Sequence, residues 1–166
     1  MSVLTSEKNT EALSLTFVAE FDADVDRVWQ VWEDPRKLER WWGPPTYPAT
    51  FERHDFVVGG ESHYYMTSPE GEKMRGWWQI TAIDAPHRIE FDDGFADADG
   101  SRSTSIDAIH AAVTLSAFDG GTRMTVHSTF TSAEQLEQMV KMGMEEGMRQ
   151  AIGQIEAVLR SETAPA

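Results

Sequence analysis

The sequence contains no cysteine among its 166 residues. This absence excludes disulfide bonds, thiolate metal sites and a cysteine nucleophile. It fits a reducing compartment, and we expect a cytoplasmic protein. No apolar run approaches the roughly 20 residues needed to cross a bilayer, and residues 1–8 lack the apolar stretch of a signal peptide. We therefore expect a soluble protein without a membrane span.

Positive charge is also scarce. The chain has 14 lysines and arginines against 28 aspartates and glutamates, which gives a net charge of -14. Such a field repels phosphate backbones, so we expect no nucleic-acid partner. Charge of this kind favours solubility and says little about fold. The composition leaves the oligomeric state open.

Tryptophan, phenylalanine and methionine are plentiful, with six, eight and eight copies. A chain of this length buries enough surface to hold one core without covalent staples. We find no internal repeat and no long linker, and we expect a single domain over residues 10–160. The two ends, residues 1–9 and 161–166, are expected to be frayed tails.

The hydrophobic period changes several times along the chain. Alternation predicts strands over residues 11–21, 50–58, 61–67, 72–83, 88–92, 108–118 and 122–130. Helical spacing predicts short helices over residues 24–33 and from Pro35, and a long helix over residues 132–160. The acidic stretch 93–107 is expected to be a loop without regular structure.

Three glycines interrupt the long helix, namely Gly143, Gly147 and Gly153. Each costs up to about 1 kcal/mol relative to alanine inside a helix. Their presence predicts a bend or a close approach to the sheet. Consecutive strands flanked by segregated helices indicate an α+β protein with an antiparallel sheet.

Five segments resemble, in the right order, those of one family. They are residues 21–29, 34–44, 55–60 with its double glycine, 120–126 and 143–148. They are similar to the START-like (SRPBCC) superfamily, in the branch named after the activator of the heat-shock-protein-90 ATPase. The resemblance covers residues 13–159. It implies a helix-grip fold: a curved antiparallel sheet wrapped around a long C-terminal helix, with two short helices after the first strand and a ligand cavity between sheet and helix.

Alternation assigns the faces of the strands. The inner face is predicted to carry apolar groups on neighbouring strands, which meet methionines of the long helix. These are the expected ligand-binding residues: His54, Phe56, Tyr64, Met66, Trp78, Met139, Met144 and Met148. Val58 is assigned to the same face. The opposite set is expected to face solvent: His63, Tyr65, Arg75, Trp77, His110 and His127.

His54 has three interpretations. It bonds the backbone at the sheet rim, orients a polar group of a ligand, or acts as an acid or base. His110 and His127 are expected to be cross-strand neighbours, but no third ligand for a metal is evident, so we predict no metal site. The segment 97–100 is expected to be a solvated loop and not a calcium site. Phosphate-binding, dinucleotide-binding and nucleophile-elbow motifs are absent, so we predict no cofactor and no catalytic residue.

The leading hypothesis is binding of a small hydrophobic or aromatic molecule, of lipid-like or polyketide-like character. One alternative is an aromatase/cyclase-like enzyme, which the resemblance also allows. Another is a protein-interaction module such as a co-chaperone, which an exposed apolar patch around Trp41 or Trp77 would favour. Trp41 and Trp42 are adjacent, so we expect one in the core and the other at the cavity mouth or exposed.

Overall fold

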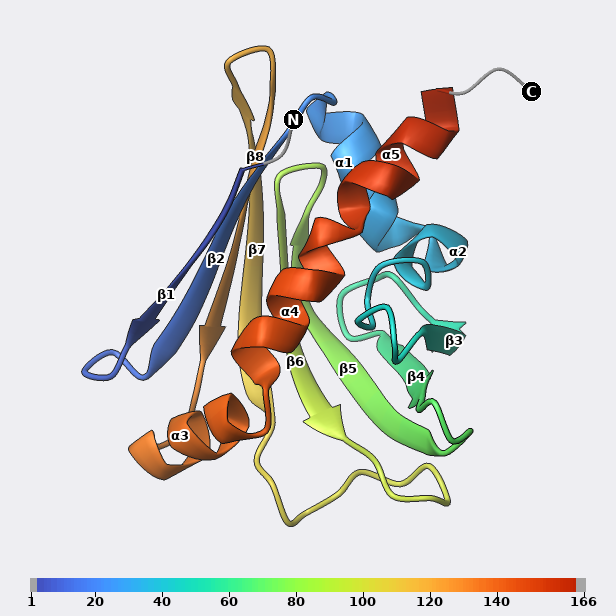
Figure 1. The fold of residues 1–166 in the computed structure, drawn as a ribbon, viewed down its shortest axis with the longest axis vertical. Helices are drawn as coiled ribbons and strands as arrows, with labels where there is room; N and C mark the ends of the chain where they lie inside the picture. Colours follow the sequence, from blue (N-terminus) through green and yellow to red (C-terminus); the bar gives the residue numbers. More distant parts are fainter. Residues whose placement is uncertain (1–2, 164–166) are drawn as a thin grey trace.

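A computed structural model describes residues 3–163 of the chain. These residues form one antiparallel sheet of eight strands, in the order β1-β2-β8-β7-β6-β5-β4-β3, and five helices (Figure 1). The strands are β1 (Val3–Asn9), β2 (Ser14–Phe21), β3 (Ala49–His54), β4 (Glu61–Thr67), β5 (Lys73–Asp84), β6 (Arg88–Phe95), β7 (Ile109–Phe118) and β8 (Gly121–Thr129). The helices are α1 (Val25–Glu33), α2 (Pro35–Leu38), α3 (Ala133–Lys141), α4 (Met144–Gly153) and α5 (Ile155–Thr163). The predicted α+β helix-grip fold is confirmed.

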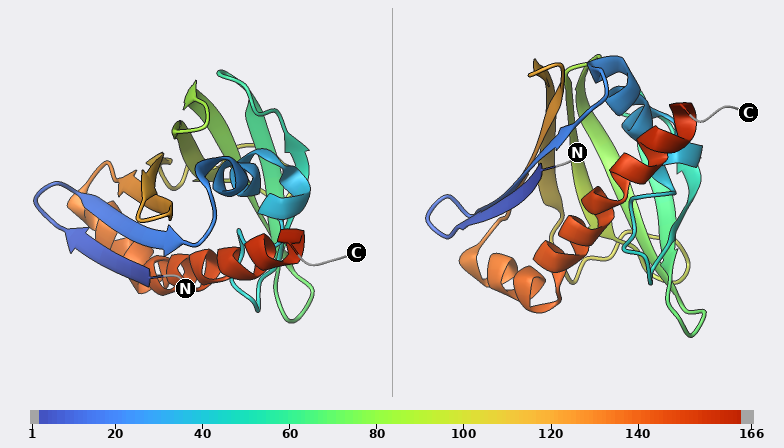
Figure 2. Two further views of the ribbon diagram at one scale, coloured as in Figure 1. Left: turned by 90° about the horizontal axis from the view of Figure 1, so that it is seen from above. Right: turned by 45° about the horizontal axis from the view of Figure 1, so that its top comes forward.

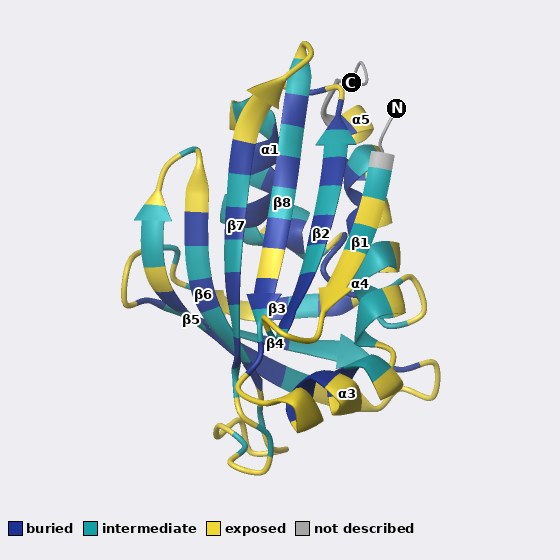
Figure 3. Ribbon diagram, turned by 90° about the vertical axis from the view of Figure 1, so that its left-hand side faces the viewer, coloured by how far each residue is buried: buried dark blue, intermediate teal, exposed yellow. Residues whose placement is uncertain are grey.

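Strands β3 to β8 are neighbours in chain order, and β2 then pairs with β8. Buried residues alternate with more exposed ones along β2 and β8, because one face of the sheet packs on the helices (Figure 3). The expected hairpin between β7 and β8 is confirmed. Asp119 and Gly120 adopt positive φ angles of 50° and 82° in its turn, a backbone conformation that glycine and aspartate tolerate.

The predicted frayed tail at residues 3–9 is wrong. These residues form β1, which pairs with β2 from Val3 opposite Glu20 to Asn9 opposite Ser14. The Asn9 side chain accepts hydrogen bonds from the backbone N–H groups of Glu11 and Ala12 and closes the turn. An edge strand held by backbone bonds needs no apolar alternation, so its polar sequence gave no strand signal. Helix α5 extends to residue 163, whereas the expected tails at residues 1–2 and 164–166 lie outside the described part.

Aspartate caps begin the two short helices. Asp24 accepts a hydrogen bond from the backbone N–H of Arg27 at the start of α1. Asp34 accepts one from Arg36 at the start of α2, where Pro35 occupies the first turn. Proline is well suited to that position because its missing N–H has no partner in a helix start.

The C-terminal helical segment is divided, where the sequence predicted one continuous helix. Gly143 has a φ of 90°, which places it in the left-handed region and ends the path of α3 before α4 begins. A second interruption at Gln154 separates α4 from α5. Helices α4 and α5 follow one another across the inner face of the sheet, while α3 takes a different direction (Figures 1 and 2). The bend anticipated from the glycines is therefore present at Gly143.

The predicted sheet faces are correct for most strands, with two exceptions. Strand β3 ends at His54, so Val58 lies in the following loop and is 63% exposed. Trp77 lies on the outer face as predicted but is buried. The Arg102 guanidinium lies 3.8 Å from the centre of the Trp77 ring and covers it. Strand β6 also extends through Phe95, beyond the predicted end at Asp92.

Candidate functional site

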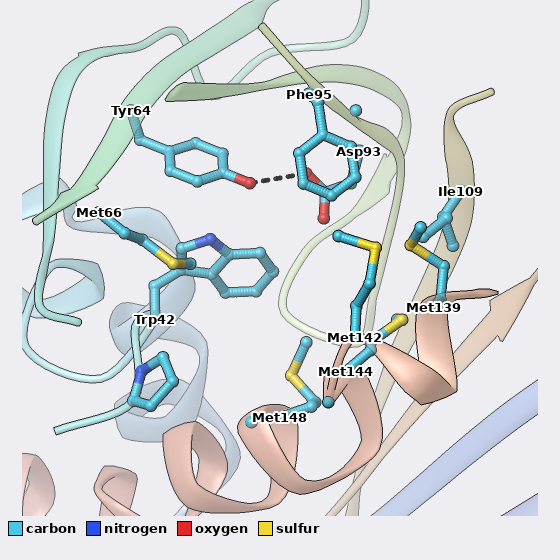
Figure 4. Close-up of a pocket in the computed structure, with 14 residues that line it drawn as sticks. Trp42, Tyr64, Met66, Asp93, Phe95, Ile109, Met139, Met142, Met144 and Met148 are labelled. Atoms are coloured by element: carbon cyan, nitrogen blue, oxygen red, sulfur yellow. Dashed lines mark hydrogen bonds between the residues drawn. The ribbon is translucent and has the colours of Figure 1, made fainter. Parts of the chain in front are cut away.

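A cavity of about 260 Å³ lies between the inner face of the sheet and the junction of α3 with α4 (Figure 4). The loop after α2, strands β4, β6 and β7, and both helices contribute its wall. Its lining residues are Trp42, Pro44, Tyr64, Met66, Asp93, Gly94, Phe95, Ile109, Met139, Met142, Gly143, Met144, Gly147 and Met148. Phe95 and Met142 are also partly open to solvent, with 39% and 59% exposure, and so mark the mouth of the cavity.

Trp42 reaches the cavity from the loop that follows α2. The Gln154 side chain donates a 2.7 Å hydrogen bond to the Gly43 carbonyl, which ties this loop to the junction of α4 and α5. Pro44 lies against Gly147 of α4, where an added Cβ would be 3.8 Å from the proline ring. The loop and α4 therefore form one wall together.

Tyr64 projects from β4 across a glycine of the next strand. Gly76 of β5 pairs with Tyr64, and a Cβ at Gly76 would overlap the tyrosine ring. Glycine in a strand commonly marks such a close approach. The ring stacks on Phe51 with a centroid distance of 5.0 Å. Tyr64 is thereby held flat against the sheet, with its hydroxyl toward β6.

Asp93 is the acceptor for that hydroxyl. Tyr64 Oη donates a 2.9 Å hydrogen bond to Asp93 Oδ1. Burial raises the pKa of the Asp93 carboxyl from 3.8 to about 7, and the hydrogen bond from Tyr64 opposes that rise. Burial, followed by the nearby Asp93 charge, raises the pKa of Tyr64 well above 10.0. At neutral pH Tyr64 is therefore a hydroxyl donor and Asp93 titrates.

Trp42 brings a third polar atom to this wall. Its Nε1 is buried and has no hydrogen-bond partner among residues 3–163. The indole packs edge-on to Tyr64 with a centroid distance of 6.0 Å. The polar groups of Trp42, Tyr64 and Asp93 thus form a short series within an otherwise apolar wall.

The structure brings five of the eight predicted ligand-binding residues together on the cavity. They are Tyr64, Met66, Met139, Met144 and Met148. The other three do not line the cavity: His54, Phe56 and Trp78. Alternation placed His54 and Trp78 on the correct face, whereas Phe56 lies in the loop after β3. All three lie nearer α1, where they contact Trp29 or Trp32. Whether the first five bind a ligand remains a prediction.

Trp78 is a core residue. It is fully buried and stacks on Phe91 with a centroid distance of 4.1 Å. It also contacts Trp32 and Trp42 within a cluster of aromatic rings. Phe56 is half-buried and packs edge-on against Trp29 of α1. Both side chains stabilise the contact between the sheet and the short helices.

His54 bonds the backbone at the sheet rim, as one of the three interpretations proposed. Its Nε2 lies 2.9 Å from the Trp32 carbonyl oxygen and its Nδ1 lies 2.7 Å from Ser62 Oγ. Burial lowers the pKa of His54, although the hydrogen bond to Trp32 opposes that change. The ring is therefore neutral at pH 7, donates from Nε2 to the carbonyl and accepts from the serine hydroxyl.

Sequence reasoning missed Asp93 as a member of the site, whereas it expected one tryptophan of the pair Trp41 and Trp42 at the cavity, and that residue is Trp42. The prediction ended a strand at Asp92, whereas the alternation of Ile89, Phe91, Asp93 and Phe95 continues on one face of β6. That alternation was the available signal. Trp41 is fully buried and donates from Nε1 to the Val31 carbonyl, so Trp41 is the core member of the tryptophan pair.

The histidines of the outer face occupy separate environments. His110 opposes Thr129, and His127 opposes Ala112. The prediction that the two histidines are direct cross-strand neighbours is therefore wrong. Burial acts to lower the pKa of His110, but hydrogen bonds to Asp92 and Glu90 outweigh it and raise the pKa. Within residues 3–163, no group of three or more histidine, aspartate or glutamate side chains is arranged to hold a metal ion.

The surface features that would favour an interaction module are not at the expected tryptophans. Trp41 is fully buried and Trp77 is 9% exposed. No helix in the described part of the chain has the length and apolar character that a bilayer crossing requires.

Comparison with known proteins shows which family shares this fold. The family model described as activator of Hsp90 ATPase homolog 1-like protein matches residues 22–160. No curated protein matches the chain significantly. A solution structure of a protein from Arthrobacter aurescens is 61% identical, covers 96% of this chain and 92% of its own, and has a TM-score of 0.91.

Two further solved structures agree along nearly the whole chain. A crystal structure of a protein from Mycobacterium smegmatis is 46% identical, covers 99% of both chains and has a TM-score of 0.88. A solution structure of a protein from Staphylococcus epidermidis is 26% identical, covers 98% of this chain and 97% of its own, and has a TM-score of 0.83. The chain therefore belongs to the family of activator of Hsp90 ATPase homolog 1-like proteins, within the START-like superfamily.

Proposed function

We propose that this protein binds a small hydrophobic molecule in the cavity between the sheet and α4. The observation that carries the proposal is the cavity itself: an apolar space of about 260 Å³ with three polar groups gathered on one wall. Ligand sites typically combine an apolar lining with few placed polar groups. An apolar cavity of about 150 Å³ accommodates benzene, so this one suits a larger aromatic or lipid-like body.

Methionine supports the same proposal. Five of the lining side chains are methionines: Met66, Met139, Met142, Met144 and Met148. Methionine is unbranched and polarisable, adapts to ligands of different shape and contacts aromatic rings favourably. Four of these five come from α3, α4 and their junction. The side of the cavity formed by the helices is therefore the side that adapts its shape to a ligand.

A pair of glycine substitutions on one helix tests the proposal. Leucine at Gly147 would start from ordinary contact with Pro44 and extend its side chain into the cavity. A Cβ at Gly153 would meet nothing within 4 Å, and Gly153 does not line the cavity, so leucine there is the control. We expect naphthalenemethanol to bind the wild type and Gly153→Leu equally in calorimetry, and to lose binding to Gly147→Leu. Absence of binding to all three proteins contradicts the proposal.

The second candidate is an enzyme acting on such a ligand. The observation that favours it is Asp93, a carboxyl in the cavity whose pKa is raised to about 7 and which accepts a hydrogen bond from Tyr64. A group with a pKa near the working pH is suited to proton transfer. A bound ligand that is chemically changed by the wild type and unchanged by Asp93→Asn supports this candidate. A ligand recovered unchanged from the wild type contradicts it.

A further inference from the structure

The cavity carries one acidic group and no basic one. Among its described lining residues, Asp93 and Tyr64 are the titratable side chains, and none is lysine, arginine or histidine. The raised pKa of Tyr64 keeps it neutral. Any charge on the wall at neutral pH is therefore negative and belongs to Asp93.

The hydrogen bonds of the wall leave one carboxyl oxygen open. Tyr64 donates to Asp93 Oδ1, and no residue in the range 3–163 donates to Oδ2. Figure 4 shows the second oxygen directed toward the methionines of the helical wall. Asp93 is half-buried, and a half-buried carboxylate with a single neutral donor is incompletely compensated. A ligand that donates a hydrogen bond to Oδ2 would give the Asp93 carboxylate its second donor.

A carboxylic acid is unsuited to this position, because two carboxylates at one site repel each other and one must take up a proton. An ammonium group is suited, because it supplies both a donor and the missing positive charge. Three aromatic residues, Trp42, Tyr64 and Phe95, line the same cavity. Aromatic faces attract cations. The net charge of -14 raises the concentration of cations near the protein.

We infer that the cavity selects an apolar amine, whose ammonium group donates to Asp93 Oδ2 while its hydrocarbon body lies among the methionines of α3 and α4. This inference rests on the proposed ligand-binding function and names the head group of the ligand. It predicts that an amine binds more tightly than fatty acids and other lipophilic anions, and more tightly than neutral alcohols of the same shape. Burial raises the pKa of Asp93 to about 7, and the positive charge of a bound ammonium group would oppose that rise.

Three probes with one naphthyl body and different head groups test the inference: naphthylmethylamine, naphthalenemethanol and naphthoic acid. Calorimetry is performed above the pKa of Asp93 on the wild type, on Asp93→Asn and on Glu146→Gln. Glu146 is an exposed carboxylate of α4 outside this cavity, so its variant removes the same charge without changing the cavity wall.

We expect the wild type to bind the amine about tenfold or more tightly than the alcohol, as a charged hydrogen bond requires, and the acid most weakly. Asp93→Asn should abolish the amine preference and retain alcohol binding, and Glu146→Gln should retain the preference. Equal binding of the three probes, or tightest binding of the acid, overturns the inference and leaves the ligand-binding function standing. Absence of binding for every probe overturns both. If Asp93→Asn does not fold, the order of the three probes on the wild type decides.

Discussion

The Tyr64 hydroxyl donates a 2.9 Å hydrogen bond to Asp93 across a position where the intervening strand carries glycine, Gly76. The three residues belong to three neighbouring strands, β4, β5 and β6. The glycine allows the tyrosine ring to lie flat on the sheet, so that its hydroxyl spans β5 and reaches the inner face of β6. The polar part of the cavity therefore depends on a residue without a side chain.

Gly76→Ala should displace the Tyr64 ring, because the new Cβ would overlap it. We expect a loss of about 1–3 kcal/mol in the free energy of unfolding, as is typical of an overpacked site. Urea denaturation measures it. Gly153→Ala is the matched control, since its Cβ would meet nothing within 4 Å, and it should raise stability by up to about 1 kcal/mol. Equal stability of Gly76→Ala and the wild type would show that the ring does not depend on this glycine.

Asp93→Asn should stabilise the protein at alkaline pH and not at acidic pH. The pKa of Asp93 is raised from 3.8 to about 7 on folding, so the folded state binds the extra proton between those values. The wild type therefore loses stability as pH rises from about 4 to about 7 and stays at the lower level above it. We expect the variant to gain about 2 kcal/mol at pH 8, within an upper limit of about 4 kcal/mol set by that shift.

Denaturation of both proteins across this pH range provides the measurement. The difference between them cancels the other titrating groups, because these are common to both chains. A difference that does not change with pH would mean that the Asp93 pKa is not raised. A difference that grows toward acid would mean that the carboxylate is stabilised by folding.

Trp78→Ala should destabilise the protein by about 3–5 kcal/mol, the typical cost of truncating a large aromatic core residue. The residue is fully buried against Phe91 and does not line the cavity. Trp78→Phe retains most of the packing and should leave the affinity for naphthalenemethanol unchanged. A loss of affinity in folded Trp78→Phe would contradict the assignment of Trp78 to the core.

Arg102→Ala should expose Trp77 on the outer face. The guanidinium covers the indole at 3.8 Å and donates a 2.7 Å hydrogen bond to Gln79, which fastens the loop after β6 to the sheet. We expect faster hydrogen exchange in residues 96–108 and a new fraction of tryptophan fluorescence open to acrylamide. The loss in stability should be about 1 kcal/mol or less. Arg88→Ala removes another exposed arginine that covers no ring and should change neither signal.

Sequence periodicity predicted the strands that bury one face. It missed the elements that are defined by backbone conformation or backbone pairing and not by burial. Strands β4, β7 and β8 alternate because their inner residues pack on helices. Strand β1 is a polar edge strand and is defined by backbone pairing to β2. The three glycines of the last helical segment gave equal signals, yet only Gly143 has a positive φ. Local composition does not separate a bend from a tolerated glycine.

The site was predicted in part for a similar reason. Alternation gives the face of a strand but not the depth along it, so Trp78 and Tyr64 seemed equivalent although the first lies in the core and the second on the cavity. Asp93 was assigned to a loop because it begins the polar, acidic stretch of residues 93–107. Its place on the inner face follows from the pairing of β6 with β5, which puts Asp93 opposite Trp78.

The most direct test of the central claim follows the methyl signals of labelled methionines by NMR while naphthalenemethanol is added. Met139, Met144 and Met148 line the cavity, whereas Met124 is buried in the core and Met74 is exposed outside the cavity. We predict saturable shifts at the three lining methyl groups, with the signals of Met124 and Met74 unchanged. Saturable shifts at Met74 alone, or no saturable shift at any lining methionine, would contradict a ligand site between the sheet and α4.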